Sequence, residues 1–383
     1  MNVAFIHNEK KLGTGAHFIN ELMATRLREA GVRVKNFYPK NPLLDAPLHL
    51  KGMSNILFFY SLLEHKDEIL KYDLIQGTTY TPLAFLPFKI PVVSHFGSTS
   101  WGFLKAVPLA KDMEPALRKI WLLLKSAGAI QELNVRTRRP LQDVAEIEKL
   151  VAVRADAVIA TSGIVRQDLL NVGVASDSIY IVPNAIEDYW FRHRQLVVQA
   201  QPSLVFLGRV GADAFTLKLK GFDRLIDLYQ RFPSVLKYTI GMTTNKELVR
   251  WCDQTIPNHH FYANLQKERI PELLGDKAGS ILLITSRYEG FSLSLIEGMS
   301  QGLIPVTYPV GIAPEIIQNG VNGFLVDSQT EGRRTVDYLL HLSAEKRHEL
   351  ATAARETAKS FNSRTICKRL LAVYSETLKR KRR

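Results

Sequence analysis

The chain has 383 residues, of which 46% are hydrophobic and 23% are charged, so a largely disordered polymer is excluded and two globular domains are favoured. The formal net charge is +13, and the terminal run Lys379-Arg380-Lys381-Arg382-Arg383 supplies five of these charges. Two cysteines, Cys252 and Cys367, are too few for a disulfide framework or a zinc site. No run approaches about 18 apolar residues and no secretory pattern opens the chain, so we expect a cytoplasmic protein.

The first half of the chain alternates short apolar runs with helical stretches. Strand patterns occupy residues 3–6, 32–38, 74–75, 92–93, 157–160 and 179–182, and residues 16–30 have helical spacing that ends at Gly31. Strands that alternate with helices indicate parallel βαβ units and a doubly wound sheet.

A second series of strand patterns follows a less patterned linker at residues 185–201. It comprises residues 204–207, 238–240, 260–262, 281–284 and 304–307. We therefore expect an α/β class with two Rossmann-like domains, at residues 1–190 and 200–362. Residues 363–383 are expected to form a C-terminal helix and basic tail that crosses back to the first domain.

Residues 105–150 differ from the rest of the first half because their pattern is helical and contains no strand signal. Leu117, Ile120, Trp121 and Leu124 have helical spacing, with cations such as Arg118 among them. We interpret this segment as an elaboration of the first domain. It is either a helical layer of the core or a basic amphipathic element for a membrane surface.

The richest chemistry lies after the strand at residues 281–284. Glu289 precedes a helix that Ser292 is placed to cap, and Glu297 lies inside that helix. Free N–H groups at a helix start favour an anion. The two carboxylates are placed to accept from vicinal hydroxyls on either side of a diphosphate. The spacing alone is weak evidence, because a solvated loop residue and a surface helix residue give the same pattern.

The wider context resembles the retaining glycosyltransferases of family four, which have the two-domain GT-B fold. The resemblance is carried by the Glu289–Glu297 pair and by short runs elsewhere in the chain. These runs are residues 92–95, 155–162, 182–185, 206–209, 220–223, 302–306, 311–317 and 319–326. This resemblance implies two domains that face each other across a cleft. It also implies a nucleotide-sugar donor, with UDP- or GDP-sugars expected.

The same resemblance implies roles for individual residues. Arg209 and Lys220 would clamp the donor diphosphate, with Lys218 as a second candidate, while Glu289 would contact the sugar and Glu297 the ribose. Cations at a departing diphosphate also make sense physically, because negative charge develops there. The donor loop would further include Gly290, Phe291, Ser292 and Leu293, and a strand-end His95 would face the sugar.

Gly13 and Gly15 open the first helix, and the resemblance implies a loop that faces the donor phosphates. They do not form a dinucleotide fingerprint, since the third position is Phe18. Some residues depart from the family pattern. Gly298 stands in place of Ala, Ser292 in place of Gly, and Ile312 replaces the second Gly of a pair.

We therefore expect a metal-independent, retaining hexosyltransferase that uses no cofactor beyond its donor and acts on an envelope polysaccharide, a glycolipid or another glycoconjugate. The acceptor is expected to be a glycan or lipid-linked hydroxyl in the first domain. The cations at residues 379–383 are expected to contact an anionic membrane at its inner face. The alternatives are a nucleic-acid- or polyanion-binding protein, a silent nucleotide-sugar-binding subunit, and a sugar phosphorylase or sugar-phosphate synthase of the same architecture.

Overall fold

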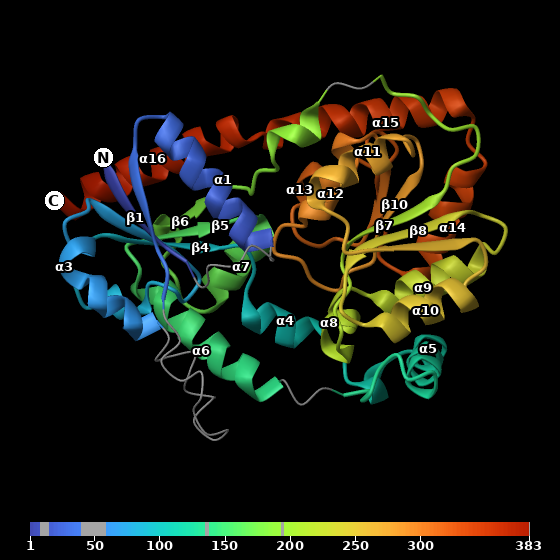
Figure 1. The fold of residues 1–383 in the computed structure, drawn as a ribbon, viewed down its shortest axis with the longest axis horizontal. Coiled ribbons are helices and arrows are strands. Elements are labelled where there is room, and N and C mark those ends of the chain that lie inside the picture. The colour runs from blue at the N-terminus through green and yellow to red at the C-terminus, as the bar shows by residue number, and fades with distance from the viewer. Residues whose placement is uncertain (8–14, 40–58, 135–137, 193–194, 383) are drawn as a thin grey trace. The chain divides into compact units, whose positions relative to one another are not determined.

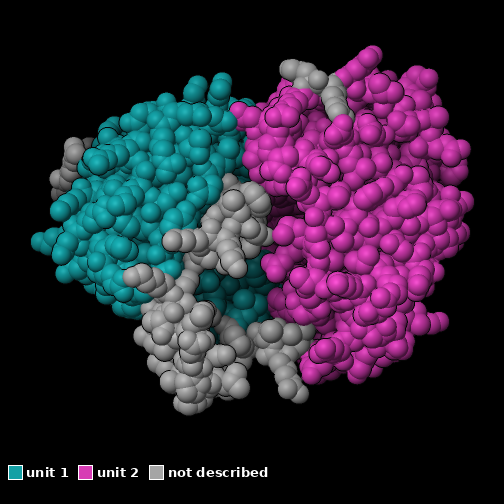
Figure 2. All heavy atoms as spheres, in the orientation of Figure 1, with its two compact units in different colours: residues 1–104, 138–186, 361–383 teal, residues 105–137, 187–360 magenta. Residues whose placement is uncertain are grey.

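The computed structural model describes residues 1–7, 15–39, 59–134, 138–192 and 195–382 (Figure 1). Its contacts divide the chain into two compact units, which Figure 2 colours separately. Unit 1 contains residues 1–104, 138–186 and 361–383, and unit 2 contains residues 105–137 and 187–360. Within the described residues, each unit is built on one six-stranded sheet. The expected α/β class with two Rossmann-like domains is confirmed.

The sheet of unit 1 is fully parallel, with the strand order β2-β1-β3-β4-β5-β6. Its strands are β1 (Asn2–Ile6), β2 (Arg33–Phe37), β3 (Leu74–Thr78), β4 (Val92–Phe96), β5 (Ala157–Ala160) and β6 (Ile179–Ile181). The helices are α1 (Gly15–Glu29), α3 (Lys66–Ile69), α4 (Ser100–Ala106), α6 (Arg138–Arg154), α7 (Gly163–Asn171) and α16 (Ser363–Arg382), with 3-10 turns η2 (Ser61–His65), η3 (Leu83–Phe85) and η5 (Ser176–Ser178). β5 is apolar and buried throughout because a central parallel strand is covered on both faces, whereas the edge strand β2 mixes exposed and buried residues.

The sheet of unit 2 is also parallel, with the order β12-β11-β10-β7-β8-β9. Its strands are β7 (Leu204–Arg209), β8 (Lys237–Met242), β9 (His259–Ala263), β10 (Ile281–Ile284), β11 (Ile304–Thr307) and β12 (Phe324–Leu325). The helices are α5 (Pro115–Ser126), α8 (Ala214–Leu219), α9 (Phe222–Arg231), α10 (Lys246–Thr255), α11 (Ile270–Gly275), α12 (Leu293–Ser300), α13 (Ala313–Ile316), α14 (Gln329–Leu340) and α15 (Ala344–Ala358). The 3-10 turns are η4 (Ala110–Asp112), η6 (Asp188–Phe191), η7 (Lys267–Arg269) and η8 (Lys359–Phe361).

The segment 105–150 does not belong as a whole to the first domain. Residues 138–150 lie in unit 1, whereas residues 105–137 group with unit 2. The physical reason is the apolar face of α5, which packs against α9 and buries Leu117, Ile120, Trp121 and Leu124. The asparagine before α10 adds a polar contact, because Asn245 Nδ2 donates to Ala129 O at 2.6 Å.

The last helix groups with unit 1, where α16 runs along α1 (Figure 1). Arg26 Nε donates to Ser363 Oγ at 2.7 Å at the start of α16. The Tyr374 hydroxyl donates to the Gln76 side chain on β3. No helix among the described residues is both long and apolar enough to cross a membrane.

Candidate functional site

The carboxyl ends of β7 and β10 meet at one edge of the second sheet, since these strands are parallel neighbours. Arg209 is the last residue of β7, and its exposed guanidinium pairs with no carboxylate among the described residues. Glu289 lies in the loop between β10 and α12. This edge is where ligands bind in open α/β sheets.

Glu289 and Lys220 are in direct contact. Lys220 Nζ lies 2.6 Å from Glu289 Oε1, and Ser286 Oγ donates to the same oxygen at 2.6 Å. Both charged side chains are mostly buried, with exposed fractions of 20% for Lys220 and 15% for Glu289. The structure thus joins two residues that the sequence analysis assigned to different parts of the donor.

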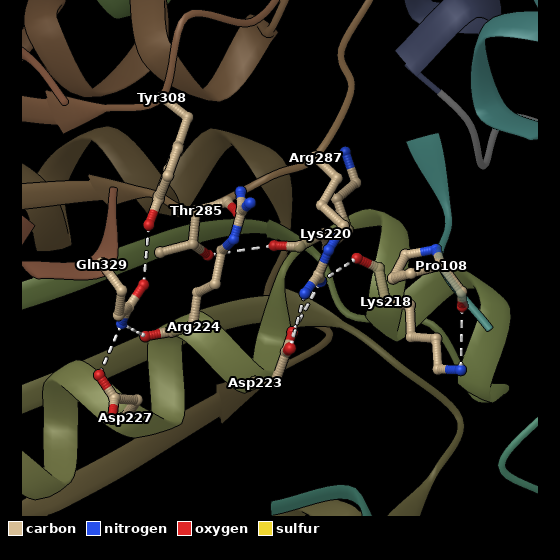
Figure 3. A network of polar contacts seen from close by, with 10 residues as sticks. All are labelled: Pro108, Lys218, Lys220, Asp223, Arg224, Asp227, Thr285, Arg287, Tyr308 and Gln329. Atoms are coloured by element: carbon tan, nitrogen blue, oxygen red, sulfur yellow. Dashed lines mark hydrogen bonds and ion pairs between the residues drawn. The ribbon is translucent and has the colours of Figure 1, made fainter. Parts of the chain in front are cut away.

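The turn at Lys220 is attached to the loop that follows β10. Thr285 Oγ1 donates to Lys220 O at 3.1 Å (Figure 3). Gly221 has φ +62, and a Cβ atom there would lie 1.8 Å from Thr285 O. Only glycine therefore fits, because a side chain would collide with backbone that cannot move away. This close approach holds Lys220 beside Glu289.

Lys218, the second candidate for the diphosphate clamp, has a different environment. Its side chain is buried, and its Nζ donates to Pro108 O at 3.2 Å (Figure 3). The same Nζ donates to Asn134 Oδ1 at 3.5 Å. The Nζ also lies 5.7 Å from the centre of the Trp121 ring. Lys218 therefore fastens the segment 105–137 to unit 2, whereas Lys220 contacts Glu289.

A buried ion pair joins the Lys220 turn to the loop between β10 and α12. Arg287 Nη1 and Nη2 each donate to one oxygen of Asp223 at 2.7 Å, and Nη1 also donates to Lys218 O at 2.8 Å (Figure 3). Asp223 is fully buried, and the Arg287 side chain is only 9% exposed. The sequence analysis did not single out either residue as functional. The available signal was their position, because one follows Lys220-Gly221 and the other precedes Glu289.

Helix α12 begins after Ser292, but the expected side-chain cap is absent. Ser292 has φ +75 and ψ +74, and its hydroxyl accepts no hydrogen bond from a helix N–H group. The left-handed backbone is the physical reason, since a capping serine normally has extended dihedral angles. The Ser292 Oγ atom is buried and has no partner among the described residues.

Replacing Ser292 by glycine should stabilise the protein. Glycine removes the cost of a left-handed backbone and the buried, unpaired hydroxyl, which together outweigh its extra freedom in the unfolded chain. We expect a gain of about 1 kcal/mol in the free energy of unfolding, measured by urea denaturation. A loss of stability would show that the hydroxyl has a structural role.

The donor-loop residue Phe291 contacts the loop that follows β11. Ile312 N donates to Phe291 O at 3.0 Å. Gly311 has φ +57, and a Cβ atom there would lie 2.4 Å from Phe291 O. The retained first glycine of this pair is thus required by close packing, whereas Ile312 is buried and needs no glycine.

Glu297 lies in the middle of α12 and is buried. Burial raises its pKa, the nearby Lys267 ammonium opposes this rise, and the Glu187 carboxylate adds to it. Lys267 Nζ lies 3.3 Å from Glu297 Oε1 and 2.6 Å from Glu187 Oε1. The sequence analysis missed Lys267 and Glu187, which lie far from Glu297 in the chain.

His95 belongs to unit 1, on β4 between β3 and β5. Burial lowers its pKa to about 4, against an opposing effect of the Asn184 side chain, so the imidazole is neutral at pH 7. A neutral imidazole donates and accepts hydrogen bonds but carries no charge. Gly15 is the first residue of α1, and Gly13 lies outside the described residues.

The two elements expected to meet one membrane belong to different units, which corrects the expectation that both lie on the first domain. Trp121 is fully buried on α5 in unit 2, whereas Leu122 and Leu123 are 48% and 42% exposed. The tail belongs to unit 1 and is partly neutralised there. Arg380 Nη2 lies 2.5 Å from Asp177 Oδ2, and Lys381 Nζ lies 2.5 Å from Asp156 Oδ1. Lys379 is exposed, the Arg382 side chain lies outside the description, and so does Arg383.

Part of unit 2 matches a known family model. Residues 197–357, which include Arg209, Lys220, Glu289 and Glu297, match the model of the family Glycosyl transferases group 1. A curated relative from Klebsiella pneumoniae, an uncharacterized 41.2 kDa protein in the cps region, is 24% identical over 220 residues. The match covers 55% of this chain and 59% of that protein, so it spans less than two thirds of the relative's length.

Solved structures match almost the whole chain. Sucrose-phosphate synthase from Thermosynechococcus elongatus has a TM-score of 0.73 at 16% identity, with 98% of both chains covered. WaaG, a glycosyltransferase involved in lipopolysaccharide biosynthesis, has a TM-score of 0.67 at 15% identity over 97% of this chain and 99% of its own. Anabaena Alr3699/HepE in complex with UDP-glucose has a TM-score of 0.66 at 17% identity over 98% and 100%.

These neighbours define the class of fold, which is the GT-B fold of glycosyltransferases. The stretch of the chain that matches the model of the glycosyl transferases group 1 lies within unit 2 and includes Glu289 and Lys220.

Proposed function

We propose that the protein is a retaining glycosyltransferase that moves a hexosyl group from a UDP- or GDP-sugar to a hydroxyl acceptor. The observation that carries the proposal is the Glu289 carboxylate, which Lys220 and Ser286 hold at the carboxyl edge of the second sheet. The lysine that we assign to the phosphates and the carboxylate that we assign to the sugar are in contact, inside the part of the chain that matches the family.

The proposed reaction breaks the bond between the anomeric carbon and the diphosphate oxygen and forms a bond to the acceptor oxygen on the same face. The departing phosphate oxygen takes the acceptor's proton. Arg209 and Lys220 stabilise the charge on the diphosphate, because charge-assisted hydrogen bonds are strong where water is scarce. Glu289 holds the sugar, and the neutral His95 binds a sugar hydroxyl.

The remaining assignments concern the rest of the donor. Glu297 accepts hydrogen bonds from the ribose hydroxyls. The backbone of residues 290–293 approaches the phosphates. Anabaena Alr3699/HepE is described in complex with UDP and with UDP-glucose, which supports a uridine nucleotide as the first donor to test.

The acceptor class follows from the relatives. One relative is encoded in a cps region, and WaaG is described as involved in lipopolysaccharide biosynthesis. We therefore propose a hydroxyl group of an envelope polysaccharide or glycolipid as the acceptor, bound through unit 1.

A thermal-shift screen with UDP, GDP, ADP and their common sugars tests the donor proposal. A ligand that binds only the folded state raises the melting temperature, and a concentration of about 100 times Kd contributes about 2.7 kcal/mol. We expect UDP or GDP to raise the melting temperature equally with and without EDTA, because Arg209 and Lys220 supply the cations. No shift with any nucleotide contradicts the donor proposal, and a shift that requires Mg²⁺ or Mn²⁺ contradicts metal independence.

We also propose that the protein works at the cytosolic face of an anionic membrane. Leu122 and Leu123 are exposed on α5 among the exposed cations Arg118, Lys119 and Lys125. Exposed apolar side chains within a basic helix face suit a lipid headgroup layer. Because Trp121 is buried, we assign the membrane contact of α5 to the two exposed leucines.

Co-sedimentation with vesicles tests this membrane proposal. Vesicles with anionic lipid should bind the protein, and binding should weaken as salt shortens the Debye length to about 10 Å at 0.1 M. The double variant Leu122→Ser, Leu123→Ser should bind less, and so should a variant that lacks residues 379–383. Equal binding to neutral and anionic vesicles, or no binding at low salt, contradicts the proposal. A salt-dependent electrophoretic mobility shift with bulk DNA would instead favour general polyanion binding.

A further inference from the structure

Three charged side chains from distant parts of the chain meet beside α12. Lys267, at the start of η7, lies between Glu187, which precedes η6, and Glu297 in α12. Its Nζ is 2.6 Å from Glu187 Oε1 and 3.3 Å from Glu297 Oε1. The exposed fractions of these side chains are 19% for Lys267, 16% for Glu187 and 9% for Glu297. All three residues belong to unit 2.

Glu187 has a second anchor that fixes its position. Trp190 Nε1 donates to Glu187 Oε2 at 3.2 Å, and the Trp190 ring is buried. Gln301, just after α12, donates from Nε2 to Trp190 O at 2.7 Å. The lysine is therefore held by a carboxylate that is itself fastened to the end of α12.

The Glu297 carboxylate has more acceptor positions than the contact with Lys267 uses. A carboxylate offers about four acceptor positions, and Lys267 Nζ lies 3.3 Å from Oε1 of Glu297, which is longer than its distance to Glu187. Without the ammonium, Glu297 would be a buried carboxylate near a second carboxylate. Such a group takes up a proton, and a protonated carboxyl no longer accepts at both oxygens.

We infer that Lys267, anchored by Glu187, is a positioning residue that keeps the Glu297 carboxylate available as the acceptor for the ribose diol of the nucleotide donor. The inference rests on the proposed function, in which Glu297 binds the ribose. Lys267 does not touch the donor in this account. Lys267 raises the affinity for a nucleotide that carries the ribose 2′-hydroxyl, and it does so through the Glu297 carboxylate.

Calorimetric titration of the full chain with UDP and 2′-deoxy-UDP tests the inference, with GDP and its 2′-deoxy form as a parallel pair. The wild type should bind the ribose form roughly 10–100-fold more tightly, the range expected for hydrogen bonds to a charged acceptor. Lys267→Met should lose most of this discrimination by weakening the ribose form and leaving the deoxy form nearly unchanged. Lys267→Arg should restore it, because arginine keeps the charge.

Two further variants separate positioning from a general structural effect. Glu297→Gln should lose the same discrimination, and the double variant with Lys267→Met should be no weaker than either single variant. Lys246→Met, an exposed lysine at the start of α10, is the matched control and should behave as the wild type. If Lys267→Met unfolds, Lys267→Gln serves instead, since it keeps a donor and removes the charge.

The outcomes distinguish the inference from the function on which it rests. If the wild type binds no nucleoside diphosphate, the proposed function fails. If the wild type discriminates and Lys267→Met discriminates equally, the role of Lys267 is wrong. Equal weakening of both nucleotide forms in Lys267→Met also overturns the inference, because it indicates a structural role alone. If the wild type binds both nucleotide forms equally, the inference also fails, because Glu297 then does not bind the ribose hydroxyl.

Discussion

Glu289→Gln should lower sugar transfer roughly 10²–10³-fold while the fold survives, which is the loss expected when one preorganised electrostatic contact is removed. Glutamine has the same shape but no charge, so it accepts a weaker hydrogen bond from a sugar hydroxyl and no longer pairs with Lys220. The turnover of the true donor and acceptor pair gives the measurement. Circular dichroism and the melting temperature report whether the fold is retained.

Arg209→Ala provides a second test at the same edge of the sheet. Because Arg209 is exposed and pairs with no described carboxylate, its removal should change stability by no more than about 0.5 kcal/mol. Its effect on turnover should nevertheless match that of Glu289→Gln. Glu349→Gln, an exposed helix variant, is the control and should keep normal turnover. Near-normal turnover in Glu289→Gln or Arg209→Ala would remove that residue from the proposed site.

Asp223→Ala should destabilise the protein by about 3–5 kcal/mol, because it leaves the largely buried Arg287 guanidinium without its carboxylate. The loss should appear as a lower urea midpoint with an unchanged slope. The surface variant Glu349→Ala removes an exposed pair with Lys346 and should cost less than about 1 kcal/mol.

A double variant makes the origin of this loss explicit. Asp223→Ala combined with Arg287→Met removes the unpaired charge, so it should recover part of the stability lost by Asp223→Ala alone. A cost below about 1 kcal/mol for Asp223→Ala, or no recovery in the double variant, would show that the ion pair does not hold the Lys220 turn in place.

The strands that could be predicted from the sequence are those with strong local signals. Residues 157–160 and 281–284 are continuous apolar runs, residues 304–307 are apolar up to Thr307, and the three segments form β5, β10 and β11 with the expected bounds. A buried parallel strand imposes this pattern because both of its faces are covered. β12 has only two residues, Phe324 and Leu325, and so is too short to produce a recognisable pattern.

Packing partners could not be predicted in the same way. The spacing of Leu117, Ile120, Trp121 and Leu124 identifies an amphipathic helix but contains no information on what covers its apolar face. The sequence of this helix is the same whether Trp121 contacts lipid or packs against protein, and the neighbouring leucines do not distinguish the two cases. The packing of α5 against α9 decides between these possibilities for Trp121.

Site residues show the same division between local and long-range signals. The Glu289–Glu297 spacing and the Lys220-Gly221 dipeptide are local, and both appear in the sequence. Lys267 and Glu187 come close to Glu297 only in the folded chain, where η7 and the segment before η6 lie next to α12. Ser292 was assigned a capping role because serine is a common N-cap residue, yet its left-handed backbone depends on how the loop packs.

The central claim is that unit 2 binds a nucleotide sugar whose anomeric bond is cleaved with retention. Proton NMR of the purified protein with UDP-glucose, followed from the first minutes, tests this claim directly, with the other nucleotide sugars tested in turn. The wild type should release nucleoside diphosphate and form a product with the anomeric configuration of the donor, and Glu289→Gln should release roughly 10²–10³-fold less. A product of inverted configuration, or release by the wild type no faster than by Glu289→Gln, would contradict the account.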